Sequence, residues 1–253
     1  MSAVVAGVDG CRGGWIVALH DPAASAIELF RIGAVDELWQ RHPDLAAVAI
    51  DMPIGLPERT GPRGRTPERL VRPLLGQRQS SVFSIPSRSA VYAALDARVP
   101  EAERFRHCCA VARATSAENK AVARQSFAIF PKIAELDQWL RADPARAARV
   151  HECHPEVSFW AINQERPLAE PKKVKHRLWP AGFALRQQLL QRQGFDGSLV
   201  TADLASRLGA GLDDLIDACA ACWTARRIAD GRAQSFPDPP ERDPFQLPIA
   251  IWA

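Results

Sequence analysis

The sequence of 253 residues lacks several features that would assign it to a special class of protein. No apolar run approaches the roughly 18 residues that span a bilayer, so we expect no association with a membrane. The stretch MSAVVAGVDG has neither the basic start nor the long apolar run of a signal peptide, which predicts a cytoplasmic protein. The composition, 47% hydrophobic and 24% charged, is ordinary for a globular protein. The length suits a single domain over residues 1–253.

The six cysteines form no regular disulfide framework. Cys219 and Cys222 have the spacing of a metal or redox pair, but the sequence has no second pair to complete a zinc site. Both lie within an apolar helical pattern, so buried core thiols are predicted instead. His151 and His154 bracket a glutamate but also lack the usual spacing of zinc ligands.

Acidic residues are scarce in one part of the chain, although the net charge is only +3. Residues 59–88 contain seven arginines and one acid, and a second basic cluster, KKVKHR, covers residues 172–177. Because local patches rather than total charge contact phosphates, these clusters indicate nucleic-acid binding. The alternative is a solvated, flexible insertion, but the apolar residues of SSVFSIP within it favour an ordered segment.

The order of the predicted elements indicates an α/β protein. Apolar runs predict three strands in succession within residues 4–34, then a helix, and a fourth strand at residues 45–51. Residues 58–90 look like an irregular insertion, followed by helices broken near Pro131. A strand near residue 151, a late helix over residues 212–230 and an added edge strand at the C-terminal end complete the pattern. Strands followed by α/β units predict a mixed sheet with helices on both faces.

Two aspartates stand where apolar strands end. Asp9 and Asp51 each follow four or five apolar residues, so they meet at one end of the sheet if the two strands are neighbours. Two carboxylates with little water around them repel each other, and a divalent cation resolves the conflict. The alternative for each residue alone is the capping of a turn. Beside Asp9, the glycines of GVDGCRGGW let the chain turn back without covering it.

The late helix supplies further acids. Asp214 and Asp217 are spaced i, i+3 and project from one face. The same face continues with small residues, which predicts one wall of a narrow cleft: Ala221, Thr224 and Ala225. Asp213 lies nearer the helix start, where we expect it to cap free N–H groups.

Several stretches together resemble one family, domain of unknown function 429, whose members are described as predicted ribonuclease H-like nucleases. The matching stretches are GVDGCRGGW, IDMPIGLP, GQRQSSVFSIPSR, QSFAIFPKIAELD, ECHPEVSFW and LDDLIDA. The resemblance implies a ribonuclease H-like fold, a five-stranded mixed sheet flanked by helices. A basic insertion over about residues 58–125 would follow the fourth strand.

The wider superfamily includes RuvC-type junction resolvases, which hold metal with an acid on the first strand, one after the fourth and two on the last helix. By resemblance those positions fall on Asp9, Asp51, Asp214 and Asp217. Asp51 stands where the resolvases have glutamate. The resemblance therefore implies a Mg²⁺- or Mn²⁺-dependent nuclease that acts on DNA or RNA.

Other charged residues are candidates with less defined roles. Glu152 and Glu156 have no counterpart in the resolvases, so each is an extra ligand, a base or a partner of a nearby basic residue. Arg78, Arg88 and Lys173 are the residues we expect to contact phosphates.

Two other functions compete with the nuclease. One is a non-catalytic nucleic-acid-binding or regulatory protein that retains the fold. The other is an actin-like sugar kinase, which the chain length and the lack of a later glycine-rich adenosine motif argue against. The sequence leaves open a homodimer and the choice between DNA and RNA.

Overall fold

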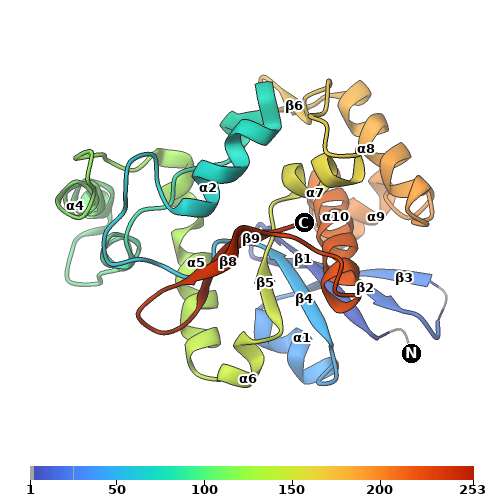
Figure 1. The fold of residues 1–253 in the computed structure, drawn as a ribbon, viewed down its shortest axis with the longest axis horizontal. Coiled ribbons are helices and arrows are strands. Elements are labelled where there is room, and N and C mark those ends of the chain that lie inside the picture. The colour runs from blue at the N-terminus through green and yellow to red at the C-terminus, as the bar shows by residue number, and fades with distance from the viewer. Residues whose placement is uncertain (1–2, 25) are drawn as a thin grey trace.

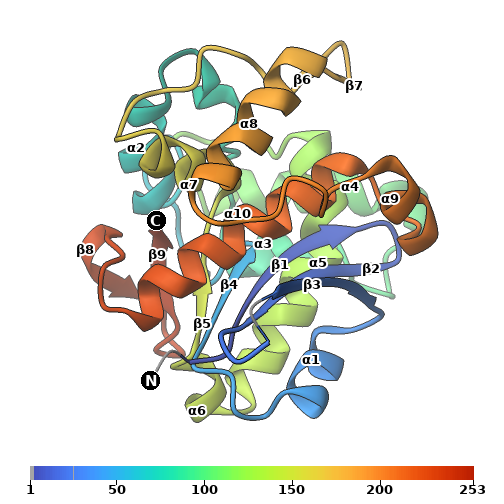
Figure 2. The same ribbon diagram turned by 90° about the vertical axis from the view of Figure 1, so that its right-hand side faces the viewer.

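The structure is a computed structural model that describes residues 3–24 and 26–253. Its centre is a five-stranded sheet with the strand order β3-β2-β1-β4-β5 (Figure 1). The first strand pairs antiparallel with β2 and parallel with β4, and helices cover both faces (Figure 2). The predicted α/β class and mixed sheet are confirmed, and the arrangement is consistent with a ribonuclease H-like fold. The strands are β1 (Val5–Cys11), β2 (Gly14–Asp21), β3 (Ala26–Ile32), β4 (Ala47–Asp51) and β5 (Val150–Glu152).

One face of the sheet is covered by α10 (Leu212–Ala229), which lies across β1, β2 and β4 (Figure 2). Gly7 makes this close approach possible, because a Cβ atom there would lie 1.9 Å from the backbone nitrogen of Cys222. The small residues Ala221 and Ala225 are fully buried, and Thr224 shares a hydrogen bond of 2.8 Å with Ser158. The prediction that these small residues line a cleft is therefore wrong, since they pack inside the protein.

The opposite face of the sheet is covered by α5 (Arg124–Arg141). The predicted break near Pro131 is wrong, because one helix continues through the proline. Proline removes one helical hydrogen bond. Phe130 and Ile133, on either side of it, are fully buried with Val8 and Val17 of the sheet, and this packing holds the helix together.

Residues 58–90 are more regular than predicted, since they contain an α-helix, a 3₁₀ helix and the start of a further α-helix. A proline at the start of α2 favours helix initiation. At the start of α3, the Ser87 hydroxyl caps the helix by accepting a hydrogen bond from the Ala90 N–H. The helices of residues 58–125 are α2 (Thr66–Val71), η1 (Arg72–Ser81), α3 (Arg88–Ala93) and α4 (Glu101–Ala114).

The C-terminal residues were expected to add an edge strand to the sheet, and this expectation is wrong. Instead, β8 (Ser235–Arg242) and β9 (Pro248–Trp252) pair with each other in a separate two-stranded sheet. One parallel bridge, between Trp252 and Cys153, joins β9 to the residue that follows β5.

All six cysteines are buried and free, as expected for core thiols. Within the described residues, no helix is both long enough and apolar enough to cross a membrane. The remaining elements are α1 (Val35–Arg41), α6 (Pro144–Ala147), α7 (Pro155–Ile162), β6 (Lys173–Val174), β7 (Arg177–Leu178), α8 (Pro180–Arg192) and α9 (Ala202–Leu208).

Candidate functional site

Asp9 and Asp51 lie side by side at one end of the sheet. They are paired residues in the parallel register of β1 and β4. Asp217, one turn into α10, is close enough for its charge to act on both. The sheet and the helix thus bring together three of the four acids that the sequence analysis grouped, and we call Asp9, Asp51 and Asp217 the cleft acids.

The cleft acids have few hydrogen-bond donors. Within the described part of the chain, no backbone N–H and no basic side chain donates a hydrogen bond to Asp9 or Asp51, although Asp9 is buried and Asp51 partly so. The carboxyl groups of Asp9 and Asp51 contact each other instead. Asp217 is 4% exposed, and its Oδ1 atom is buried without a partner. Withdrawing carboxylates from water without donors is costly, so this end of the sheet favours a bound cation.

The electrostatics of the cleft acids reflect this arrangement. Burial, and then the neighbouring charges of Asp51 and Asp217, raise the pKa of Asp9 well above its usual range. Burial likewise raises the pKa of Asp51. The pKa of Asp217 is raised to about 6 by burial and by Asp51, although Lys172 opposes the shift. The folded protein therefore holds these carboxylates in an environment that resists their combined negative charge.

Lys172 supplies the missing positive charge. Its ammonium group forms an ion pair with Asp217 Oδ2, and the side chain is 27% exposed. Burial alone would lower the pKa of Lys172, but Asp217 and Asp9 together raise it above its usual value. The basic cluster KKVKHR was predicted to contact phosphates through Lys173, whereas its first residue, Lys172, is the one that contacts the cleft acids.

Lys172 adjoins a short β-hairpin formed by β6 and β7, and we call residues 172–178 the basic hairpin. Its turn consists of Lys175 and His176, both with positive φ angles of 48° and 64°. Such a turn matches the twist of a two-residue hairpin loop but is strained for residues other than glycine and asparagine. The turn leaves both side chains exposed above the cleft acids' end of the sheet.

Asp213 and Asp214 both lie in the first turn of α10. Asp214 Oδ2 accepts a hydrogen bond of 2.8 Å from the Gly211 N–H, so Asp214 contributes to the cap. Asp213 forms an ion pair with Lys173. Burial opposes the shift, but the Lys173 ammonium and the Asp213 backbone N–H lower the pKa of the Asp213 carboxyl, so the predicted interaction with a free N–H group at the helix start exists beside the ion pair. Asp214 still faces the cleft acids, because its charge raises the pKa of Asp9.

Glu152 and Glu156 are both bound by buried arginines. Glu152 accepts hydrogen bonds from Arg65 at 2.6 and 3.0 Å and from the Ile54 N–H at 2.7 Å. Glu156 accepts two from Arg186, at 2.7 and 2.8 Å, and Arg186 is fully buried. Of the alternatives that the sequence left open for these glutamates, the geometry favours partners of basic residues.

A cleft of about 950 Å³ opens beside the cleft acids. Arg78 and Lys173 line it, as do Asp213 and Asp214. The insertion and the basic hairpin contribute to its walls, and Figure 1 shows α2 and β6 on the same side of the sheet. The cleft therefore joins acidic and basic side chains that lie far apart in the sequence.

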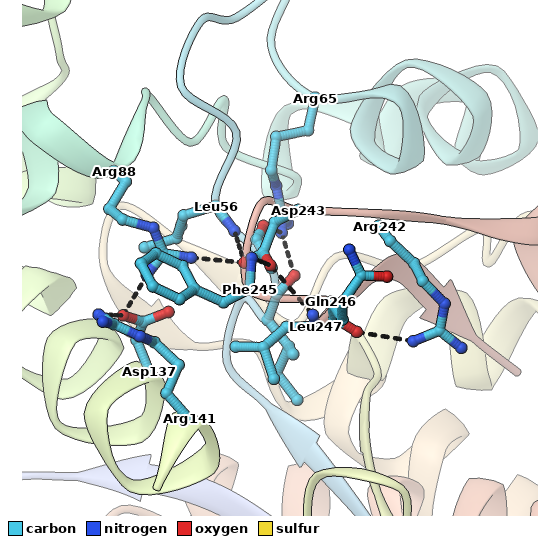
Figure 3. Close-up of polar contacts among 12 residues, drawn as sticks. Leu56, Arg65, Arg88, Asp137, Arg141, Arg242, Asp243, Phe245, Gln246 and Leu247 are labelled. Atoms are coloured by element: carbon cyan, nitrogen blue, oxygen red, sulfur yellow. Dashed lines mark hydrogen bonds and ion pairs between the residues drawn. The ribbon is translucent and has the colours of Figure 1, made fainter. Parts of the chain in front are cut away.

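Arg88 lies away from this cleft, in a polar cluster that Figure 3 shows. Its guanidinium forms ion pairs with Asp137 of α5 and with Asp243 of the β8–β9 connection. The Arg88 guanidinium also lies 4.6 Å from the ring centre of Phe245. The guanidinium of Arg141 lies 3.6 Å from the same ring centre. Arg88 therefore does not join the residues that were expected to contact phosphate. Its ion pairs connect the insertion to α5 and to the β8–β9 connection instead.

The cleft acids match the donor chemistry of a hard divalent cation. They offer carboxylate oxygens, one of them a buried atom with no partner. Within residues 3–24 and 26–253, however, no group of three or more His, Cys, Asp and Glu side chains is arranged to hold a metal as it stands. Lys172 would have to release Asp217 before that carboxylate could act as a full ligand.

Comparison with known families agrees with the resemblance of the motifs. The model of the family described as "Protein of unknown function (DUF429)" matches residues 7–242, nearly the whole chain. No curated protein and no solved structure matched. The match includes Asp9, Asp51 and the whole of α10, so the chain belongs to the DUF429 family.

Proposed function

We propose that this protein is a divalent-metal-dependent nuclease that hydrolyses phosphodiester bonds in DNA or RNA. The observation that carries the proposal is the set of three converging carboxylates, Asp9, Asp51 and Asp217, which have one donor, Lys172, among the described side chains. A nuclease site needs acids that are available to a cation. Acids with a structural role are satisfied by protein donors instead.

In this proposal the cleft acids hold Mg²⁺ or Mn²⁺, with Asp214 beside them. When bound, two such ions supply an activated water and stabilise the leaving oxygen. The chain itself positions the ligands: the β1–β4 register aligns Asp9 with Asp51, and α10 fixes Asp217 against them. Lys172 balances the charge of Asp217 until the cation binds.

Phosphate recognition falls to the basic residues of the cleft. Lys173 is 44% exposed at the rim, and Arg78 lines the cleft from the insertion. Their charges attract a polyanion, and such contacts depend strongly on salt. The exposed hairpin residues Lys175 and His176 extend the same surface.

The ion pair between Lys172 and Asp217 also favours a second candidate, a nucleic-acid-binding protein that does not catalyse a reaction. In that protein Lys172 would serve as a permanent substitute for the metal. The two candidates differ in whether a divalent ion changes the nucleic acid, and a cleavage assay separates them.

The assay follows a labelled single strand and a labelled four-way junction with Mg²⁺, Mn²⁺ or EDTA. We expect metal-dependent cleavage by the natural protein, and none by Asp217→Asn. Asp203→Asn is the matched control, since Asp203 is an exposed acid that pairs with Arg207 on α9. No cleavage by the natural protein with either metal, or full activity of Asp217→Asn, would favour the binding protein.

A further inference from the structure

Phe83 is an exposed aromatic side chain inside the cleft. It is 37% exposed, whereas its neighbour Val82 is 5% exposed and belongs to the core. Phe83 lines the same cleft as Asp9 and Arg78. Its ring thus remains partly in water within a cleft lined by charged side chains, where a ligand can reach it.

The backbone around Phe83 is held in place by Arg72. Its Nε atom donates a hydrogen bond of 3.1 Å to the Val82 carbonyl, and its Nη2 atom donates one of 2.8 Å to the Ser84 hydroxyl. The Arg72 guanidinium thus forms hydrogen bonds with the residues on both sides of Phe83. The ring is therefore presented by an ordered segment, which lowers the entropy lost when a ligand binds.

The surroundings of Phe83 combine apolar contact with hydrogen bonding and positive charge. The preceding turns of the chain contribute polar and basic side chains to the same cleft: Gln77, Arg78, Ser80 and Ser81. The basic hairpin contributes Lys173, Lys175 and His176. An aromatic platform beside a positively charged groove is the combination that binds single-stranded nucleic acid, with bases on the rings and phosphates along the groove.

The size of the cleft is compatible with a ligand as small as one unpaired base. About 950 Å³ lies within the range of pockets that enclose small ligands. A protein reads a duplex through its grooves and backbone, because each base face is covered by the next base pair. An unpaired base has a free face and can stack on an aromatic side chain.

We propose that Phe83 is a stacking platform for an unpaired base, and that the substrate of the cleft is therefore single-stranded nucleic acid. This inference rests on the proposed nuclease function and specifies its substrate class. The base would lie on Phe83, while Arg78 and the basic hairpin contact the flanking phosphates. No metal is needed for this contact, so it can be measured separately from cleavage.

The test measures binding by fluorescence anisotropy at low salt in EDTA, where metal-dependent cleavage cannot occur. The probes are a short labelled oligothymidylate and a strand of the same length and charge made of abasic residues. The variants are Phe83→Ala, Phe83→Trp and a control, Leu70→Ala. Leu70 is 43% exposed on α2 and does not line the cleft. Thermal melts establish that each variant is folded.

We expect Phe83→Ala to weaken oligothymidylate binding about 5- to 150-fold, the range for one base–aromatic stack. Abasic-strand binding should be unchanged, and Phe83→Trp should restore the affinity. Leu70→Ala should bind both strands like the natural protein. Equal binding of oligothymidylate by Phe83→Ala and the natural protein, or equal losses on both strands, would overturn the stacking role and leave metal-dependent cleavage standing. If the natural protein bound neither strand, the stacking role would fall, and the cleavage assay on the four-way junction would decide the proposed function separately.

Discussion

Two sets of acids in this protein are treated in opposite ways. The cleft acids share a single described donor, Lys172. The second set, which we call the arginine-bound acids, comprises Glu152, Glu156, Asp137 and Asp243, and each of these pairs with an arginine. Both sets are shielded from water, so burial alone does not identify a functional acid. What separates the two sets is the supply of basic donors, since each arginine-bound acid has an arginine and the cleft acids have Lys172 on Asp217.

The arginine-bound acids also hold the cleft acids in place. Directly after Asp51, Glu152 accepts the Ile54 N–H and Asp243 accepts the Leu56 N–H. Arg65 donates to the carbonyls of Ile54 and Gly55 in the same segment. The arginine-bound acids and Arg65 therefore hold the segment that follows β4. Asp51, at the end of β4, is positioned by this segment and its own carboxylate oxygens are not used for the purpose.

The largest effect on stability should come from separating Arg65 from its acids. Arg65→Met would leave Glu152 and Glu68 buried without their counter-ion, at a cost of about 3–5 kcal/mol in the free energy of unfolding. Arg69→Met, on the exposed side of the same helix, should change it by less than about 0.5 kcal/mol. Urea unfolding measures both. Similar values for the two variants would remove the distinction between the sets.

A smaller change should follow when Lys172 is removed from the cleft acids. Lys172→Met removes the ion pair with Asp217, so the affinity of the variant protein for Mn²⁺ should rise. The increase should be about tenfold if the ion pair contributes about 1.4 kcal/mol. Lys173→Met should have a smaller effect, because Lys173 pairs with Asp213 instead. Calorimetric titration compares the variants. Unchanged or weaker binding by Lys172→Met would mean that Lys172 helps the site rather than competing with the cation.

A further effect concerns the pH dependence of stability in the absence of metal. The pKa of Asp217 is raised in the folded state to about 6, mainly by burial, so the folded protein keeps a proton that the unfolded chain releases near pH 4. The stability contributed by this group is present below about pH 4 and is lost as the pH rises to about 6. Asp217→Asn should flatten that part of the stability profile in EDTA. A natural protein that gains stability relative to Asp217→Asn over this interval would contradict the sign.

The sequence was informative about the cleft acids because their signals are local. An apolar strand that ends in an acid predicts where Asp9 and Asp51 lie, and the i, i+3 spacing places Asp217 on one face of α10. The order of the strands then predicts that these acids meet. The same logic predicted the mixed sheet.

The sequence was uninformative where a partner comes from a distant segment. Arg88 looked like a phosphate contact because its neighbours in the chain are basic, but its partners are 49 and 155 residues away. Lys172 and Asp217 are 45 residues apart. Pro131 was expected to break a helix, and the burial of Phe130 and Ile133 outweighed the lost hydrogen bond. Such outcomes depend on tertiary packing, which local patterns do not encode.

The most direct test of the difference between the two sets is calorimetric titration with Mn²⁺ of the natural protein, Asp51→Asn and Asp137→Asn. Asp137 is the matched acid, because it is buried and bound by Arg88, Tyr92 and Arg141. We expect the natural protein and Asp137→Asn to bind Mn²⁺ and Asp51→Asn to lose that binding while remaining folded. Equal binding by Asp51→Asn and the natural protein, or no binding by the natural protein, would contradict the assignment of the cleft acids to a metal site.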